Sequence, residues 1–235
     1  MGVEGRGVAH AVLAYPCRVG VPDLLLDALP VIDLLEITGS TSAVAEMTQR
    51  DQSTVSRIYR RASDRLGLAF AKTEDGLYQA HANQDLLQDL RRSSQRLRLQ
   101  DPAALRWVGS PRTPAVVLLP GGEPSARAPT LIRRWDDDQR TCSLLRQHML
   151  DLAVVPGLKL LPPESLCGAL PMPIPLACGC LLARPLVGHP SASTHGPGDV
   201  DVIVHRTDLS AEPALMVLVE ALQQGCRNAT LPVAP

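Results

Sequence analysis

The sequence predicts a mixed fold of helices and strands in two parts, a winged helix-turn-helix near the N-terminus and a longer α/β region after it. Two helix-forming segments separated by a tight turn lie between residues 39 and 67. An Asp-Gly pair between short apolar runs follows, as in a β-hairpin. Beyond residue 101, strand-like and helix-like runs alternate, which is typical of an α/β domain with a mainly parallel sheet.

Composition limits the possible classes of protein. The 235 residues suffice for one large or two small domains, and a hydrophobic fraction of 45% with 20% charged residues indicates a globular chain. With a formal net charge of −1 the protein as a whole is not polybasic, so any attraction to nucleic acid must be local. No apolar run reaches the roughly 18 residues of a membrane helix, and residues 1–20 are expected to form an extension that is not a signal peptide.

Six scattered cysteines form no CxxC pair, which predicts buried or free thiols in a reducing cytoplasm; a redox or metal sensor is the alternative. The six histidines have no metal-ligand spacing. The run Asp136–Asp138 is expected to be a solvated loop or helix cap rather than a cation site. No constellation supports an enzyme, and no cofactor or metal is predicted.

The segment Pro22 to Leu35 is rich in leucine and interrupted by Pro30. It could form one kinked helix or a short lead-in followed by a helix that begins at Pro30. We favour the second, because Leu29, Ile32 and Leu35 then pack under the helix-turn-helix.

The helix-turn-helix stretch, residues 39–67, reads GSTSAVAEMTQRDQSTVSRIYRRASDRLG. A cluster of good N-cap residues, Ser40 to Ser42, predicts the start of a short first helix. Asp51 is an expected N-cap for a second helix, Gln52 to Leu66, and Gly67 stands where a left-handed stop is expected.

The second helix has two chemically different faces. Its apolar residues fall on one face at helical spacing: Val55, Ile58, Ala62 and Leu66. Residues that can contact base edges and phosphates occupy the outer face: Gln52, Ser53, Thr54, Ser56, Arg57, Arg60 and Arg61. The pattern therefore fits a recognition helix in a major groove, or an ordinary amphipathic helix with a solvated charged face.

Two further elements are expected before residue 102. Leu68–Phe70 and Leu77–Tyr78 flank Glu74–Gly76, which predicts the wing hairpin. The charge of Lys72 in this hairpin is offset by acidic neighbours, so wing contacts to DNA should be weak.

The segment Asn83 to Gln100 is predicted to form one helix. Its seam consists of Leu86, Leu90 and Leu97, while Arg91, Arg92, Arg96 and Arg98 line the other positions. A partial apolar seam needs a partner, which predicts a dimer.

In the α/β region, strands are expected at residues 105–108, 130–135, 150–155, 176–182 and 200–206, with an apolar run at 115–119. Helices are expected at 140–149 and 210–224, with Gly225 as the stop of the last helix.

The helix-turn-helix stretch resembles the N-terminal domain of the LysR-type transcriptional regulators. The resemblance runs through Gly39-Ser40, Ala45 and Leu66-Gly67, and its most specific piece is DQSTVSR, residues 51–57. The run LLRQHMLDLAVV, residues 144–155, and the turn Gly188-His189-Pro190 are similar to parts of that family's effector domain. The sequence departs from the family pattern at Val44, Thr48, Ala62-Ser63 and Ala71.

The resemblance implies a cytoplasmic, sequence-specific regulator that binds double-stranded DNA, without a membrane, and dimerises through the linker helix. It also implies a periplasmic-binding-protein-like effector domain of two lobes; here only Ser191 to Asp199 stand where the second lobe would be, so we expect a reduced, single-lobe domain. The expected organisation is an extension (1–20), a winged helix-turn-helix (21–82), a linker helix (83–101) and the reduced domain (102–235).

The resemblance also assigns roles to residues. Ser56 and Arg57 would hold phosphate, Gln52, Ser53 and Thr54 would face base edges, and Arg60 and Arg61 would add backbone contacts, with Ser40 and Thr41 beside them. A small-molecule effector of unknown identity would contact Ser110 and Thr113, after the first strand of the α/β region. The alternative is a decayed regulator that acts as a protein-interaction module; the acidic wing, the near-neutral charge and Ala62-Ser63 favour it, and the DQSTVSR run disfavours it.

Overall fold

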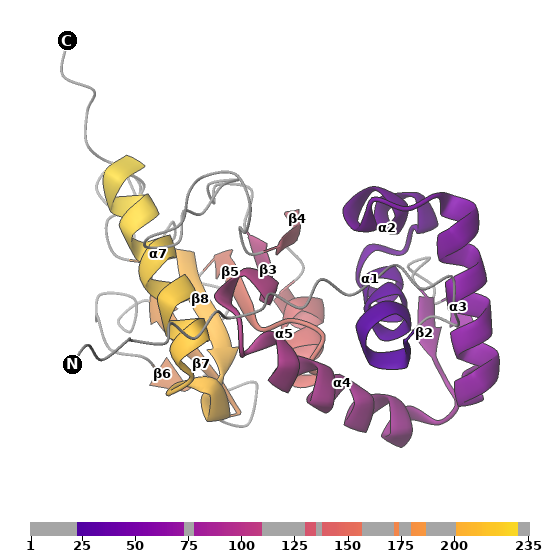
Figure 1. Cartoon of the computed structure of the whole chain (residues 1–235). Helices are drawn as coiled ribbons and strands as arrows, with labels where there is room; N and C mark the ends of the chain where they lie inside the picture. The colour runs from indigo at the N-terminus through magenta and orange to yellow at the C-terminus, as the bar shows by residue number, and fades with distance from the viewer. Residues whose placement is uncertain are drawn as a thin grey trace, which may run out of the picture.

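The computed structural model describes residues 23–72, 78–109, 130–134, 138–156, 172–173, 180–186 and 201–229. Figure 1 shows a helical part, residues 23–80, which we call the head, beside a sheet flanked by helices, which we call the body. The helix α4 (Gln84–Arg98) runs between them. The mixed fold with a winged helix-turn-helix, a linker helix and an α/β part is thus as predicted.

The head begins with a π-helical turn, η1 (Leu24–Ala28), that leads without a break into α1 (Leu29–Thr38). The structure thus has a short lead-in followed by a helix, as favoured, but the lead-in is itself helical and α1 begins at Leu29 rather than at Pro30. The Asp23 carboxylate accepts hydrogen bonds from the backbone N–H groups of Leu25 and Leu26, which starts the helix early. Pro30 lies in the first turn of α1, where its missing N–H costs little.

The predicted helix-turn-helix is confirmed as α2 (Thr41–Thr48) and α3 (Gln52–Leu66). The wing strands are β1 (Phe70–Lys72) and β2 (Tyr78–Ala80), which pair antiparallel, while the acidic turn expected between them lies outside the described residues.

The body contains one six-stranded sheet among the described residues, in the order β4-β3-β5-β8-β7-β6. Its strands are β3 (Arg106–Gly109), β4 (Thr130–Arg134), β5 (Leu152–Pro156), β6 (Met172–Pro173), β7 (Leu181–Pro185) and β8 (Asp201–Arg206). The strand β3 is parallel to β4 and β5, whereas the pairs β5-β8, β8-β7 and β7-β6 are antiparallel.

The expectation of a mainly parallel sheet was therefore wrong. Strands buried on both faces are apolar throughout whatever their direction, so the apolar runs did not reveal which way each strand points. The apolar run expected at 115–119 lies outside the described residues, as does most of the strand expected at 176–182.

Among the described residues, four helical segments flank the strands of the body: η2 (Pro102–Ala104), α5 (Asp138–Arg146), η7 (Thr207–Leu209) and α7 (Pro213–Ala229). Helix α7 continues past Gly225, which was expected to end it. A Cβ atom at Gly225 would meet nothing within 4 Å. Gly225 also lacks the positive φ of a left-handed helix stop, so the helix continues through it.

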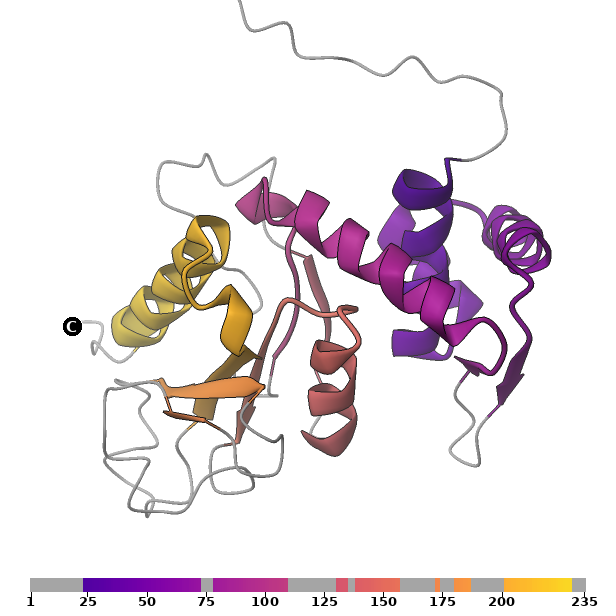
Figure 2. The same ribbon diagram turned by 90° about the horizontal axis from the view of Figure 1, so that it is seen from below.

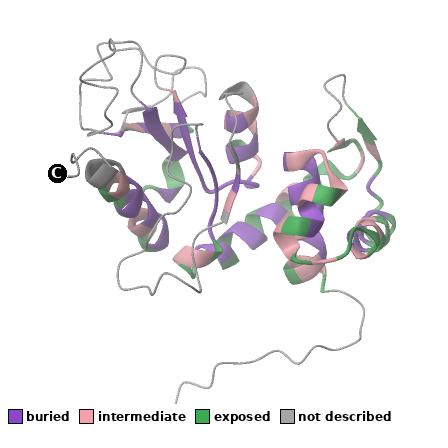
Figure 3. Ribbon diagram, turned by 90° about the horizontal axis from the view of Figure 1, so that it is seen from above, coloured by how far each residue is buried: buried purple, intermediate pink, exposed green. Residues whose placement is uncertain are grey.

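Two apolar cores stabilise the protein, one on each face of the sheet (Figure 2). Helix α7 covers one face with Leu215, Leu218 and Leu222. The other face packs on α5, and its core continues into the head, so that Val155 of β5 and Val55 of α3 belong to one cluster. Figure 3 shows that the described strands of this six-stranded sheet are mostly buried. Among the described residues, no helix is long and apolar enough to cross a membrane.

Candidate nucleic-acid interface

Helix α3 is amphipathic in the way that its sequence predicts. Val55, Ile58, Ala62 and Leu66 are buried in the core of the head. The opposite side of the helix is exposed to solvent at Ser53, Arg57, Arg60 and Arg61. An exposed polar and basic helix face of this kind is available for contact with a partner.

The turn before α3 brings the starts of two helices together. Ser40 caps α2, since its Oγ accepts a hydrogen bond from the N–H of Ala43 at 3.3 Å. Gln49 closes α2 in a left-handed conformation with φ of 52°. Asp51 occupies the N-cap position of α3 as expected, but its side chain makes no capping hydrogen bond and remains exposed.

Side-chain hydrogen bonds order the polar residues at the start of α3. Gln52 Nε2 donates to Thr41 Oγ1 at 2.8 Å, which joins the first turns of α2 and α3. Arg57 Nη2 donates to Thr54 Oγ1 at 3.0 Å. Ser53 is exposed and Ser56 is half-buried. The structure therefore brings Thr41, Gln52, Thr54 and Arg57 into two hydrogen-bonded pairs.

The positive charge of α3 is largely uncompensated. In the described part of the chain, no ion pair joins Arg57, Arg60 or Arg61 to a carboxylate. By contrast, Arg50 in the preceding turn lies 2.8 Å from Asp27. Unpaired guanidinium groups on an exposed helix can donate bidentate hydrogen bonds to phosphate.

Aromatic residues of the wing pack against α3. Tyr59 of α3 makes edge-to-face contacts with the rings of Phe70 and Tyr78, at centroid distances of 5.1 and 6.5 Å. Where α4 begins, Asn83 Nδ2 donates to the carbonyls of Leu66 at 2.7 Å and Gly67 at 3.3 Å. The C-terminus of α3 is thus anchored to the strand and helix that follow it.

A buried ion network beneath the head was not foreseen from the sequence. Asp33 of α1, which is fully buried, accepts hydrogen bonds from Arg91 Nε at 2.8 Å and Arg106 Nη1 at 2.9 Å. Arg91 also lies 2.9 Å from Glu36 of α1. Helix α1 of the head is therefore linked through α4 to strand β3 of the body.

A second group of contacts extends this network into the body. Arg98 of α4 donates to both carboxylate oxygens of Asp151 at 2.9 Å. The backbone N–H of Arg106 also donates to Asp151, at 2.8 Å. His148 accepts a hydrogen bond from Arg98 on its carbonyl and lies 2.7 Å from Gln95 Oε1 through Nδ1.

Burial and charge shift the acid–base properties of these groups. Burial raises the pKa of Glu36 above its ordinary value, although the charge of Arg91 opposes the shift. Burial works against the charge on Arg91, but attraction by Asp33 and Glu36 outweighs it and raises that guanidinium pKa. Burial, helped by the charge of Arg206, lowers the pKa of His148 to about 4.

The sequence held a weak signal for this network. Asp33 and Glu36 are acids within an otherwise apolar helix, and Arg91 and Arg98 are seven residues apart in α4, on one face. The sequence pattern places Arg91 and Arg98 simply outside the leucine seam. In the structure they are buried, while Arg92 and Arg96 are exposed.

The leucine seam of α4 faces solvent in the single chain. Leu86 and Leu97 are 45% and 49% exposed, whereas Leu90 is partly packed against the core of the head. Two of the three seam residues are thus available to a partner.

The expected effector residues Ser110 and Thr113 lie outside the described residues, so that site stays a prediction. The same holds for the run at Asp136, apart from Asp138 at the start of α5. Of the cysteines, Cys142 is half-buried and Cys180 is exposed, and their role as thiols also stays a prediction.

No protein-family model matches the chain, and no curated protein matches it. The solved structures that it resembles are LysR-type transcriptional regulators. A full-length OxyR from Pseudomonas aeruginosa is 14% identical with a TM-score of 0.43, covering 86% of this chain and 97% of its own. The LysG regulator from Corynebacterium glutamicum with bound effector Arg is 13% identical, with a TM-score of 0.34 and coverages of 86% and 99%.

Vibrio fischeri DarR in complex with DNA is 16% identical with a TM-score of 0.26, covering 60% of this chain and 53% of its own. All three TM-scores lie below 0.5.

Proposed function

We propose that the chain is a transcriptional regulator that binds double-stranded DNA by placing α3 in the major groove. The observation that supports this best is the exposed face of α3, where Arg57, Arg60 and Arg61 lack carboxylate partners among the described residues. A major groove admits one α-helix, and the N-terminal residues of that helix contact the base edges.

The residues of this face divide into two roles. Gln52, Ser53 and Thr54 form the first turn of α3 and would face base edges, where amide and hydroxyl groups discriminate between bases. The guanidinium groups of Arg57, Arg60 and Arg61, together with Ser56, would bind phosphates and set the register. Ser40 and Thr41, at the start of α2, would contact the flanking backbone.

We further propose that two copies pair through the linker helix, residues 83–101. The exposure of Leu86 and Leu97 on one side of α4 supports this, since large apolar side chains at that level of exposure gain from burial in a dimer. A twofold dimer would bind an inverted repeat whose half-sites are about one helical turn apart or a multiple of it.

The experiment is selection from a randomised duplex library with the purified chain, followed by fluorescence anisotropy at several salt concentrations. We expect enrichment of an inverted repeat and an affinity that falls steeply with salt. If no sequence is enriched and no DNA is retained even at low salt, the DNA proposal fails and the head is better explained as a protein-interaction module.

Two variants test the division of roles, with one control. Arg57→Ala should weaken binding to specific and random DNA alike and reduce the slope of log affinity against log salt by about 0.9, the contribution of a single neutralised phosphate. Gln52→Ala should cost about 1–3 kcal/mol on the selected site and little on random DNA. Arg146→Ala removes an exposed arginine of α5, on the body, and should leave both affinities unchanged.

A further inference from the structure

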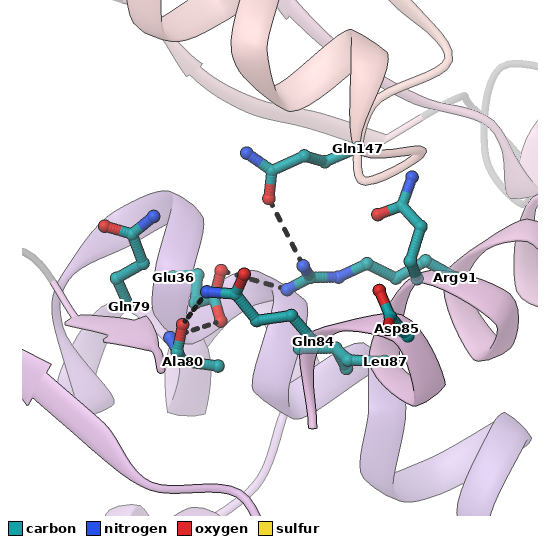
Figure 4. Close-up of a pocket in the computed structure, with 9 residues that line it drawn as sticks. Glu36, Gln79, Ala80, Gln84, Asp85, Leu87, Arg91 and Gln147 are labelled. Atoms are coloured by element: carbon teal, nitrogen blue, oxygen red, sulfur yellow. Dashed lines mark hydrogen bonds and ion pairs between the residues drawn. The ribbon is translucent and has the colours of Figure 1, made fainter. Parts of the chain in front are cut away.

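A cavity of about 250 Å³ lies where the head meets the body (Figure 4). Its walls come from four elements that are far apart in the sequence: α1, the wing strand β2, α4 and the residue that follows α5. It is separate from the exposed face of α3. Any molecule bound there would touch the head and the body at once.

The floor of the cavity is charged and buried. Glu36 and Arg91 are 4% and 3% exposed, and both line the cavity. Figure 4 shows the guanidinium group of Arg91 between Glu36 and Gln147. The buried guanidinium group of Arg91, paired with Glu36, therefore borders the space above the floor of the cavity.

This guanidinium group has donors to spare. Its Nε is used by Asp33, and its Nη1 reaches Gln147 Oε1 only at 3.4 Å. Nη2 lies 2.9 Å from Glu36, an ion pair that occupies one of its two N–H groups. Because a guanidinium carries five N–H donors, at least two remain for a ligand.

The mouth of the cavity is polar and carries the opposite charge. Asp85, Gln79 and Gln84 are exposed at its edge, while Gln88 and Gln147 are half-buried in its walls. Gln84 is held in place by a hydrogen bond from its Nε2 to the carbonyl of Ala80 at 2.9 Å. The arrangement is a buried Arg91–Glu36 ion pair below, an exposed carboxylate above and amide groups between them.

We propose that this cavity binds a small zwitterion of amino-acid size, with its carboxylate on Arg91 and its ammonium group toward Asp85. Pockets for drug-sized ligands measure about 300–1,000 Å³, so a space just below that range suits a smaller metabolite. The cavity is lined by two carboxylates, Glu36 and Asp85, and one guanidinium group, Arg91, so a ligand with two negative charges is disfavoured. A simple cation is disfavoured too, because the guanidinium group of Arg91 in the floor of the cavity would repel it.

Occupancy should also alter DNA binding, and this second part rests on the proposed function. Arg91 holds both Asp33 and Glu36 of α1, which lies under the helix-turn-helix. A ligand carboxylate on the remaining donors of this guanidinium would share its positive charge with Asp33 and Glu36, which would weaken their attraction to Arg91. The ligand and the DNA would then be coupled through one buried side chain.

The first experiment uses the full chain without DNA, so that its outcome does not depend on DNA binding. Thermal-shift screening with the free L-amino acids, followed by calorimetric titration, should identify at least one that binds. Succinate lacks the ammonium group and putrescine lacks the carboxylate, and neither should bind comparably. If no amino acid binds, or if succinate or putrescine binds as tightly as the best one, the proposal is wrong.

Variants then locate the site. Asp85→Asn should weaken the binding of that amino acid about tenfold, and Gln79→Ala should weaken it several-fold, since both side chains line the cavity and are exposed. Asp89→Asn is the matched control, an exposed acid one turn further along α4 and outside the cavity lining, and should leave binding unchanged. Equal affinity in all three variants would overturn the assignment to this cavity.

The coupling is measured last, as the DNA affinity of the unmodified chain with and without the bound amino acid. A change of at least fivefold that Asp85→Asn abolishes supports the regulatory part, and an unchanged affinity refutes it. If the chain binds no DNA at all, the proposed function fails while the calorimetric result still decides the ligand site.

Discussion

Asp33→Asn tests whether the buried ion network, rather than apolar contact alone, holds the head on the body. Asp33 is fully buried and accepts charged hydrogen bonds from Arg91 and Arg106, at 2.8 and 2.9 Å. The asparagine has nearly the same shape but no charge, so it leaves two buried guanidinium groups short of a counter-charge. Removing one partner of a buried ion pair typically costs about 3–5 kcal/mol.

The matched control is Asp27→Asn. The Asp27–Arg50 pair has the same chemistry and a contact distance of 2.8 Å, but its side chains are 37% and 32% exposed. Water screens such a pair, and its contribution is about 0–1 kcal/mol. Comparing the same substitution at the two sites therefore isolates the effect of burial. We expect Asp33→Asn to lose roughly 2 kcal/mol or more of unfolding free energy beyond the loss in Asp27→Asn.

The assay is urea unfolding, followed by circular dichroism and by tryptophan fluorescence. Circular dichroism reports the helices of the head and body, and the fluorescence includes Trp107, which is buried in the body. Because head and body share one core, both signals should change in one transition in the unmodified chain. If Asp33→Asn loses no more stability than Asp27→Asn, the network is not what fixes the head, and the argument from burial is wrong.

Two further predictions concern residues with a left-handed backbone. Gly67→Ala should cost roughly 2 kcal/mol in unfolding free energy, since φ is +62° and the new Cβ would lie 2.7 Å from Asn83 Nδ2. If the double variant with Asn83→Ala loses as much stability as the two single variants added together, the clash with Asn83 is not the cause. His148 has φ of 61° and, through burial and Arg206, a pKa of about 4, below its ordinary 6.5. The unfolded chain therefore binds the proton first, and stability should fall as pH drops from 6.5 to 4, by at most about 1.4 kcal/mol per pH unit. Asparagine also tolerates this backbone conformation, so His148→Asn should flatten the dependence of stability on pH. If urea unfolding shows the same loss of stability between pH 6.5 and 4 in the variant and in the unmodified chain, His148 is not the responsible group.

Local patterns in the sequence determined the helices and their faces. The spacing of Val55, Ile58 and Leu66 defined the buried side of α3, and Gly67 marked its end, because the helical period and the left-handed stop are properties of a few neighbouring residues. For the same reason the polar start of α3 and the exposed leucines of α4 could be located from the sequence.

Only the tertiary structure decided which distant charges meet. Arg91 and Arg98 look like ordinary surface residues of a basic helix, and their partners Asp33 and Asp151 lie more than fifty residues away. The direction of β8, which is antiparallel to β5, and the cavity between head and body depend in the same way on how separate elements pack. A sequence pattern shows which face of each element is buried. Contacts between elements far apart in the chain form only when the elements pack into the complete core.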